Sequence, residues 1–501
     1  MKKTLITFGF CAGLVAAVEA APTDAVTQAD LQALKSLIQQ QNAKIEAQAK
    51  RIAELEGKQT ATAAKVEQVA TAPRTIVPGE GTETNETGRI WTMADGRKFY
   101  LADATAGIFN PLTESGLQFE PYGYLVLEAV HNTAGTDYPM YTDYVRPRGA
   151  GHHGDHTSTL SVNDSILGFN LFSAESYNGW KTGGKFEFDL AGDNPNTTAF
   201  HVRHLYWQVE HESGWQFLFG QTWHLWKMVA PQEIDGAWME NTGYPYRRSP
   251  QIRVTKKWDF DDDSSLEIRA GLVKNGPGMG GDRDGDGTED NEQSAWCLLE
   301  GAIVYDRKAF WEEKDKRWLI GLGGQYGRDR SRRWDGEGYN GPNDDYDSDL
   351  VMIAGSIPFG KFTLTGQLFA GENLGGVQAG VGQKVAFRDL TRKGREVSTV
   401  GGFADLRYDL NDEWAFAVGY GFDNPNISKS DAVIDSSCDY TGITYNDRAY
   451  VDVFYQLTAN LHFGFEYAYL TTQYAKAYGD DADDHRFQFT VYYDFYSRLM
   501  N

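Results

Sequence analysis

The stretch "RFQFTVYYDF", residues 486–495, alternates apolar and polar side chains along its whole length. Phe487 and Phe489 share one side of an extended chain, whereas Gln488 and Thr490 share the other. Because successive side chains of a β-strand point to opposite faces, this stretch predicts a strand with one apolar and one polar face.

The same alternation recurs from residue 118 to the C-terminal region, in about sixteen segments, as is typical of outer-membrane β-barrels. The predicted strands lie near residues 118–130, 159–171, 180–191, 199–211, 215–225, 249–259, 264–274, 295–305, 317–328, 349–359, 361–371, 397–409, 413–423, 446–457, 460–473 and 485–496. Short turns such as "HESG" and "LNDE" alternate with longer polar loops. Short turns at one rim and long loops at the other indicate a transmembrane barrel.

A large soluble β-sandwich is the alternative for so many strands. A barrel of about sixteen strands is too wide for side chains to fill, so its inner face is wet and its apolar face looks outward. The polar faces here carry opposite charges and glycine, and few helices are available to cover the apolar faces. The fold class we predict is all-β, a sixteen-stranded antiparallel transmembrane barrel over residues 118–501.

The N-terminus predicts a signal peptide over residues 1–20. Lys2 and Lys3 precede a mostly apolar run, and small residues surround a cleavage site after Ala20. The apolar run is short for a membrane anchor, which is the alternative. Export by this route agrees with an outer-membrane location.

Residues 21–57 predict an α-helical coiled coil in front of the barrel. The heptad a positions hold Leu31, Ile38, Ile45 and Ile52, a seam that supercoils helices around one another. Glutamine at two d positions favours a trimer over a dimer, and a lone amphipathic helix is the alternative. Residues 58–117, rich in Thr, Ala, Glu and Gly at their start, predict a linker and the entry to the barrel.

The composition excludes some classes of function. The net charge of −23 argues against non-specific binding of nucleic acid. After cleavage only Cys297 and Cys438 remain, so the chain is not a disulfide-stapled scaffold, and whether these two pair stays open.

Four stretches resemble the DcaP-like family of outer-membrane porins. They are "GWKTGGKFEFDLAG" (179–192), "AFHVRHLYWQVE" (199–210), "WQFLFGQTWHLWK" (215–227) and "RRSPQIRVTKKWDF" (247–260). The phosphate-selective porins are similar in layout and remain a rival. The resemblance implies a homotrimer of sixteen-strand channels in the outer membrane of a Gram-negative-type bacterium. It also implies coiled coils in the periplasm and passage of small, often anionic, hydrophilic solutes.

The loop 226–248 is the candidate constriction, because the third loop of trimeric porins commonly folds into the lumen. Opposed charges across a narrow bore create a transverse field that selects solutes by charge. The acidic residues of this loop are expected to face the basic ones. The candidate lumen residues are Arg203, Glu233, Asp235, Glu240, Arg247, Arg248, Arg253 and Arg269.

The acidic stretch "DRDGDGTEDNEQ", residues 282–293, is a candidate Ca²⁺ loop, with a solvated acidic loop as the alternative. Oxygen ligands at alternating positions followed by glycine suit Ca²⁺, although position 12 holds Gln293 where a bidentate Glu is expected. The candidate ligands are Asp282, Asp284, Asp286 and Asp290. No cofactor is required for passive diffusion.

Two other functions are alternatives to a porin, an enzyme and a structural tether. A barrel enzyme would need a catalytic constellation, and the sequence contains no G-x-S-x-G, H-E-x-x-H or P-loop motif. A structural role, in which the coiled coil tethers the membrane to peptidoglycan, is compatible with a channel.

Overall fold

The structure is a computed structural model. It describes residues 90–92, 98–100, 117–147, 155–173, 176–191, 198–275, 297–309, 316–332, 341–386, 392–426, 442–475 and 478–495. The predicted signal peptide and coiled coil lie outside these residues. No helix among the described residues is long and apolar enough to cross a membrane.

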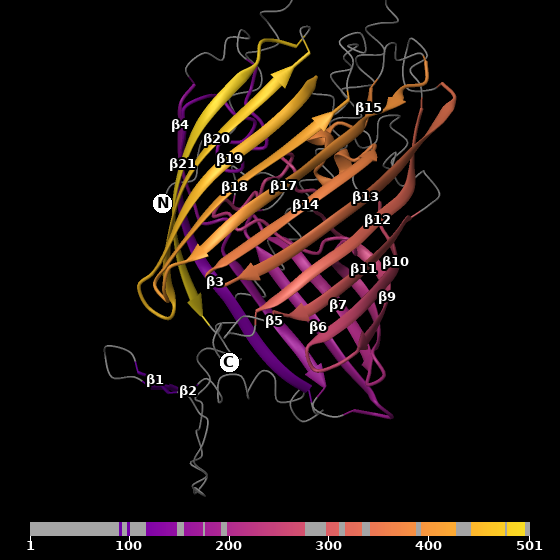
Figure 1. The fold of residues 1–501 in the computed structure, drawn as a ribbon, viewed down its shortest axis with the longest axis vertical. Helices are drawn as coiled ribbons and strands as arrows, with labels where there is room; N and C mark the ends of the chain where they lie inside the picture. Colours follow the sequence, from indigo (N-terminus) through magenta and orange to yellow (C-terminus); the bar gives the residue numbers. More distant parts are fainter. Residues whose placement is uncertain are drawn as a thin grey trace, which may run out of the picture. The chain divides into compact units, whose positions relative to one another are not determined.

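The described chain forms a closed antiparallel β-barrel in which each strand pairs with its neighbours in sequence (Figure 1). The barrel is closed where β21 pairs with β3. Its strands are β3 (Leu117–Asn132), β4 (Thr157–Ser161), β5 (Ile166–Ser173), β6 (Trp180–Asp189), β7 (His201–His211), β8 (Trp215–Trp223), β9 (Arg248–Asp259), β10 (Ser264–Val273), β11 (Leu298–Lys308), β12 (Arg317–Arg332), β13 (Asn343–Phe359), β14 (Phe362–Glu372), β17 (Ser398–Asp409), β18 (Trp414–Pro425), β19 (Ile443–Gln456), β20 (Leu461–Tyr474) and β21 (Ala482–Phe495).

The prediction of sixteen strands is confirmed for the described part of the chain, with one irregularity. Segments β4 and β5 both pair with β3, so together they form the second strand of the barrel. We predicted this strand as continuous over 159–171, but residues 162–165 interrupt it. Outside the barrel, β1 (Ile90–Thr92) and β2 (Lys98–Tyr100) form a short hairpin within the predicted linker.

The apolar faces look outward, as an outer-membrane barrel requires. In β18, Phe416, Val418 and Tyr420 are exposed, whereas the alternate residues Ala415 and Ala417 are buried inside. The other strands expose similar rows of Leu, Ile, Val and aromatic side chains. An exposed apolar band around a closed barrel is the surface that lipid covers.

The connections alternate in length around the barrel, so the short turns gather at one rim (Figure 1). Several of the long connections contain buried residues, and the first loop is one of them, with Met140 and Val145. Loop L3, residues 224–247 between β8 and β9, contains Trp226, Met239 and Tyr244, which are almost inaccessible. The connection between β14 and β17 includes two short 3₁₀ helices, η2 (Gly375–Val377) and η3 (Gly380–Gly382). It also includes the two-residue strands β15 (Val385–Ala386) and β16 (Arg395–Glu396).

Candidate functional site

Loop L3 lies inside the barrel, where its apolar side chains pack on the inner wall. Trp226 packs against Leu350 and Phe369 of β13 and β14. Tyr244 contacts Phe403 of β17 edge to face, with ring centroids 5.5 Å apart. These contacts bury two ends of the loop on strands that follow it by 100 residues or more in the chain.

Carboxylates on the wall receive the backbone of L3. Glu300 of β11 accepts a hydrogen bond from the N–H of Leu225 at 2.9 Å, and Asp405 of β17 accepts one from Gln232 at 3.0 Å. Carboxylates on β19 and β20 accept loop N–H groups in the same way. Asp452 of β19 and Glu466 of β20 accept the N–H groups of the consecutive residues 234 and 235, at 3.1 and 3.0 Å. The wall thus satisfies loop N–H groups that have no strand partner.

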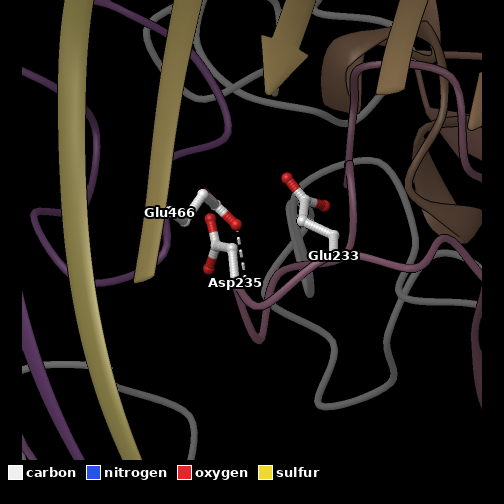
Figure 2. A group of neighbouring side chains, drawn as sticks. All are labelled: Glu233, Asp235 and Glu466. Carbon is white, nitrogen blue, oxygen red and sulfur yellow. Dashed lines mark hydrogen bonds between the residues drawn. The ribbon is translucent and has the colours of Figure 1, made fainter. Parts of the chain in front are cut away.

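A buried ion cluster joins the middle of L3 to the far wall. The Arg448 guanidinium of β19 lies 2.6 Å from Glu233, 2.7 Å from Asp235 and 2.6 Å from Glu466. Figure 2 shows Asp235 of the loop beside Glu466 of β20, with Glu233 further along the loop. Arg486 of β21 adds a contact to Asp235 at 3.1 Å.

The three carboxylates of this cluster satisfy the spacing of a metal site, because one ligand atom from each lies within 4.8 Å of the others. However, the Arg448 guanidinium contacts all three carboxylates, so a cation already occupies the position that a metal would take. The cluster is therefore an ion-pair network that holds the loop.

A cavity of about 360 Å³ lies between L3, the first loop and the wall of β6 to β9. Its lining is strongly charged and aromatic. The lining residues are Tyr138, Tyr141, Asp143, Asp164, Asp189, Ala191, His201, Arg203, Gln221, Trp223, Gly236, Ala237, Glu240, Tyr246, Arg247, Arg248 and Gln378. Acidic and basic groups on one small cavity create a strong local field.

A β-bulge in β7 turns Arg203 into this cavity. Glu187 pairs with His204 and Phe188 pairs with Val202, so Arg203 is the extra residue in the register. Its guanidinium bonds Glu187 and Asp189, both at 2.7 Å. Strict alternation from the exposed Leu205 would have put Arg203 on the lipid face, and the bulge re-aims it.

Two cations stack on the indole of Trp223, and one of them, Arg248, lines the cavity. Arg248 and Lys227 each lie 4.3 Å from the ring centroid of Trp223, and Lys227 also lies 5.4 Å from that of Trp238. Within the described residues neither cation has a carboxylate partner, and one Arg248 nitrogen, Nη1, is buried without a hydrogen-bond partner. The cation–π contacts hold these charges in place without neutralising them.

The loop acids of the cavity are hard to ionise. Burial raises the pKa of Glu240 to about 7, although Tyr246 donates a hydrogen bond to its carboxylate at 2.8 Å. Burial and the neighbouring Glu240 raise the pKa of Asp143 well above its ordinary value. Burial, with Arg248 and Arg203 nearby, lowers the pKa of Lys227 to about 8. At neutral pH the cavity therefore keeps its basic charge better than its acidic charge.

The expected pairing of the L3 acids with the neighbouring arginines is wrong for two of the three acids. Glu240 shares the cavity with Arg247 and Arg248. Glu233 and Asp235 instead turn to Arg448 and Arg486 of the far wall. The reason is that the loop crosses the lumen, which brings its middle against strands at the other end of the chain.

The last two candidate arginines do not line the cavity. Arg269 of β10 donates a hydrogen bond to the carbonyl oxygen of Leu225, at the start of L3, at 3.1 Å. It also pairs with Glu267 of the same strand. Arg253 of β9 is half-buried and follows the exposed Ile252. Arg269 is therefore placed to support the first turn of the loop.

Sequence reasoning missed part of the site. Arg448 and Arg486 are lumen-facing charges of ordinary strands, and nothing in their local sequence distinguishes them.

The connection after β14 also folds inward: Gly380 donates its N–H to Asp423 at 2.8 Å, and the Gly376 carbonyl accepts a bond from Arg247. Its signal in the sequence is the glycine- and valine-rich run 375–386, which is unlike a solvated polar loop.

A buried chain of Ser249, His224 and Glu300 has the order of a nucleophile, base and acid. His224 Nε2 lies 3.0 Å from Ser249 Oγ, and Nδ1 lies 2.6 Å from Glu300. All three side chains are buried, and none lines the described cavity. A serine that substrate cannot reach does not act as a nucleophile, so this chain fastens the start of L3 to β9 and β11.

The Ca²⁺ candidates, Asp282, Asp284, Asp286 and Asp290, lie outside the described residues, as does Cys438. Cys297 is exposed and free.

The barrel described above is similar to those of solved outer-membrane proteins. The barrel matches the DcaP outer-membrane channel of Acinetobacter baumannii with a TM-score of 0.59 and 17% identity, over 76% of this chain and 98% of that one. This is the fold of an outer-membrane channel. OmpF of Salmonella typhi (12% identity, TM-score 0.47, covering 76% and 99%) and OprB of Pseudomonas putida (9%, 0.47, 78% and 97%) are also similar.

The resemblance to DcaP indicated by the sequence motifs is thus confirmed at the level of the fold. No protein-family model matches the sequence. No curated protein matches it either.

Proposed function

We propose that this protein is an outer-membrane porin through which small hydrophilic, anionic solutes diffuse passively. The observation that carries the proposal is the cavity's uncompensated basic charge. Arg248 lines it without a carboxylate partner among the described residues, and Lys227 lies beside it on the Trp223 ring, while burial raises the pKa of Glu240. A narrow passage with excess positive charge attracts anions and repels cations.

The apolar exterior and the wet, charged interior supply the two surfaces that a membrane channel needs. Arg203 is neutralised by Glu187 and Asp189, so it shapes the field more than it adds net charge. Arg248 therefore has the largest expected effect on charge selectivity among the cavity arginines.

Planar-bilayer reversal potentials under a salt gradient test the proposal. The wild-type channel is expected to prefer chloride over potassium, and Arg248→Ala is expected to lower that preference severalfold. Arg330→Ala is the matched control, because Arg330 pairs with Asp345 on β12 and β13 and does not line the cavity. Cation preference in the wild type, or an unchanged ratio in Arg248→Ala, would contradict the proposal.

The assembly we propose is a homotrimer whose residues 21–57 form a periplasmic coiled coil. The support is the heptad seam and the structural likeness to DcaP. A variant lacking residues 21–57 is expected to form trimers that dissociate at lower temperature on semi-native gels. Trimers of unaltered stability would remove this role for the helix. A peptidoglycan pulldown with both forms tests the tethering alternative.

A further inference from the structure

The middle of loop L3 is held differently from its ends. The ends are anchored by large apolar side chains, Trp226 and Tyr244. The middle, residues 232–236, is held mainly by charges and hydrogen bonds, one of them from the Tyr492 hydroxyl to the Ile234 carbonyl, and it also has an apolar contact. That contact seats Ile234 on Gly464 of β20, where an added Cβ would lie 2.9 Å from the isoleucine Cδ1.

Arg448 is the centre of this attachment. Each of its three guanidinium nitrogens faces a different carboxylate: Nε faces Glu233, Nη1 faces Asp235 and Nη2 faces Glu466. Two of these acids belong to the loop and one to the wall, so a single side chain cross-links them. Arginine suits this role because its planar fork presents several fixed donors.

Asp235 is shared by a second arginine. Its Oδ1 lies 3.1 Å from Arg486 Nη2, which also donates to the Met140 carbonyl of the first loop at 3.0 Å. Burial opposes ionisation of Asp235, yet Arg486 and Arg448 hold its pKa below the ordinary value. The loop is therefore fixed by a carboxylate that stays charged at neutral pH.

The burial of the cluster makes this attachment sensitive to single changes. Arg448 is only 1% exposed. When one partner of a buried ion pair is removed, the remaining charge lacks both water and a counter-ion, which is strongly unfavourable. Because the apolar cluster of L3 includes Val229 and Met239 but none of residues 232–236, the middle can regain hydration by moving away from the wall.

From these contacts we infer that Arg448 is the positioning residue that holds the middle of L3 across the lumen and thereby sets the bore of the channel. The consequence for the bore rests on the proposed function; the attachment of the loop does not. Neither Arg448 nor Arg486 touches the charged cavity, so they act through the position of the loop.

Single-channel recording of Arg448→Met tests the inference. The expected result is a severalfold change in conductance, with a shift in the size of neutral polymer that the channel excludes. Arg448→Lys is expected to be intermediate, because one ammonium group cannot face three carboxylates in a fixed fork. Arg330→Met, which removes a partly exposed ion pair with Asp345, is the matched control and is expected to behave as wild type.

Asp235→Asn is the second variant, for the case in which Arg448→Met does not insert. It keeps the volume of the side chain and removes the charge shared by both arginines, so the same changes in conductance and polymer exclusion are expected. A purely structural role would lower thermal stability and leave polymer exclusion unchanged. Wild-type conductance and exclusion in Asp235→Asn, or in an inserted Arg448→Met channel, would overturn the inference.

The two proposals fail in different ways. If the wild-type protein forms no channel in bilayers, the proposed function is wrong. If the wild type conducts and the Arg448 and Asp235 variants conduct identically to it, only the positioning role is wrong. Protease cleavage within residues 232–236 gives a channel-independent readout, because release of the loop exposes its backbone.

Discussion

The carboxylate of Asp164 fills the space that a side chain at residue 236 would need. A Cβ atom on Gly236 would lie 1.9 Å from Asp164 Oδ2. The Tyr141 hydroxyl donates to the other oxygen, Oδ1, at 2.6 Å, so the carboxylate is held in place. This contact joins the tip of L3 to the interruption between β4 and β5 and to the first loop, and all three residues line the cavity.

Gly236→Ala is accordingly expected to displace Asp164 and to break its bond with Tyr141. Overpacking of a close contact costs about 1–3 kcal/mol, so the thermal unfolding temperature should fall and single-channel conductance should change. Gly301→Ala is the control, because its new Cβ would meet its nearest atom at an ordinary 3.5 Å. If both variants unfold at the same temperature as the wild type, the contact is not tight.

Charge selectivity is expected to depend on pH through Glu240. Since its pKa is about 7 in the folded protein, its carboxyl is protonated below that pH and becomes negative above it. Lys227, with a pKa of about 8, loses its positive charge at slightly higher pH. Both titrations act in the same direction, so the preference for anions should fall as the pH rises.

Reversal potentials measured from about pH 5 to about pH 9 check this dependence, a range that spans both titrations. Glu240→Gln should flatten the step near neutrality and leave the later step of Lys227. A pH profile that Glu240→Gln does not alter would show that this carboxyl does not control the field.

The outward orientation of the apolar faces predicts the cost of a charge in the middle of β18. Val418 is 51% exposed on the outer face, so Val418→Arg should reduce the free energy of unfolding by about 2–4 kcal/mol in lipid. Leu410→Arg, in the turn after β17, should cost about 0–1 kcal/mol because it lies at the strand ends. Denaturant titration from lipid vesicles measures both. Equal costs would mean that Val418 does not face the hydrocarbon.

The strands and their two faces could be predicted because a period-two pattern is local. Each strand carries its own alternation, and a closed barrel follows when the apolar faces have lipid to contact. The interruption of the second strand was missed although it has a local signal, because Asn163, Asp164 and Ser165 are all residues that favour turns. The turn is closed locally by the bond from the Ser165 N–H to the Val162 carbonyl, and only the contact of Asp164 with L3 is tertiary.

The part of the candidate site that depends on residues near one another in sequence could be predicted. The position of L3 and the clustering of Glu240, Arg247 and Arg248 follow from residues that are near in sequence. The inward turn of Arg203 depends on a one-residue bulge, which the alternation pattern cannot indicate.

The sequence by itself determined the barrel and the outward apolar band, because these depend on side-chain alternation and segment length, whereas the entry of L3 into the lumen was expected from the resemblance to trimeric porins. Only the tertiary structure decided which charges meet. Arg448 meets Glu233 and Asp235, two carboxylates that belong to L3 and lie far from it in the chain. Buried ions must find a counter-charge wherever the fold brings one within reach, and that partner is set by the closure of the barrel rather than by neighbouring residues.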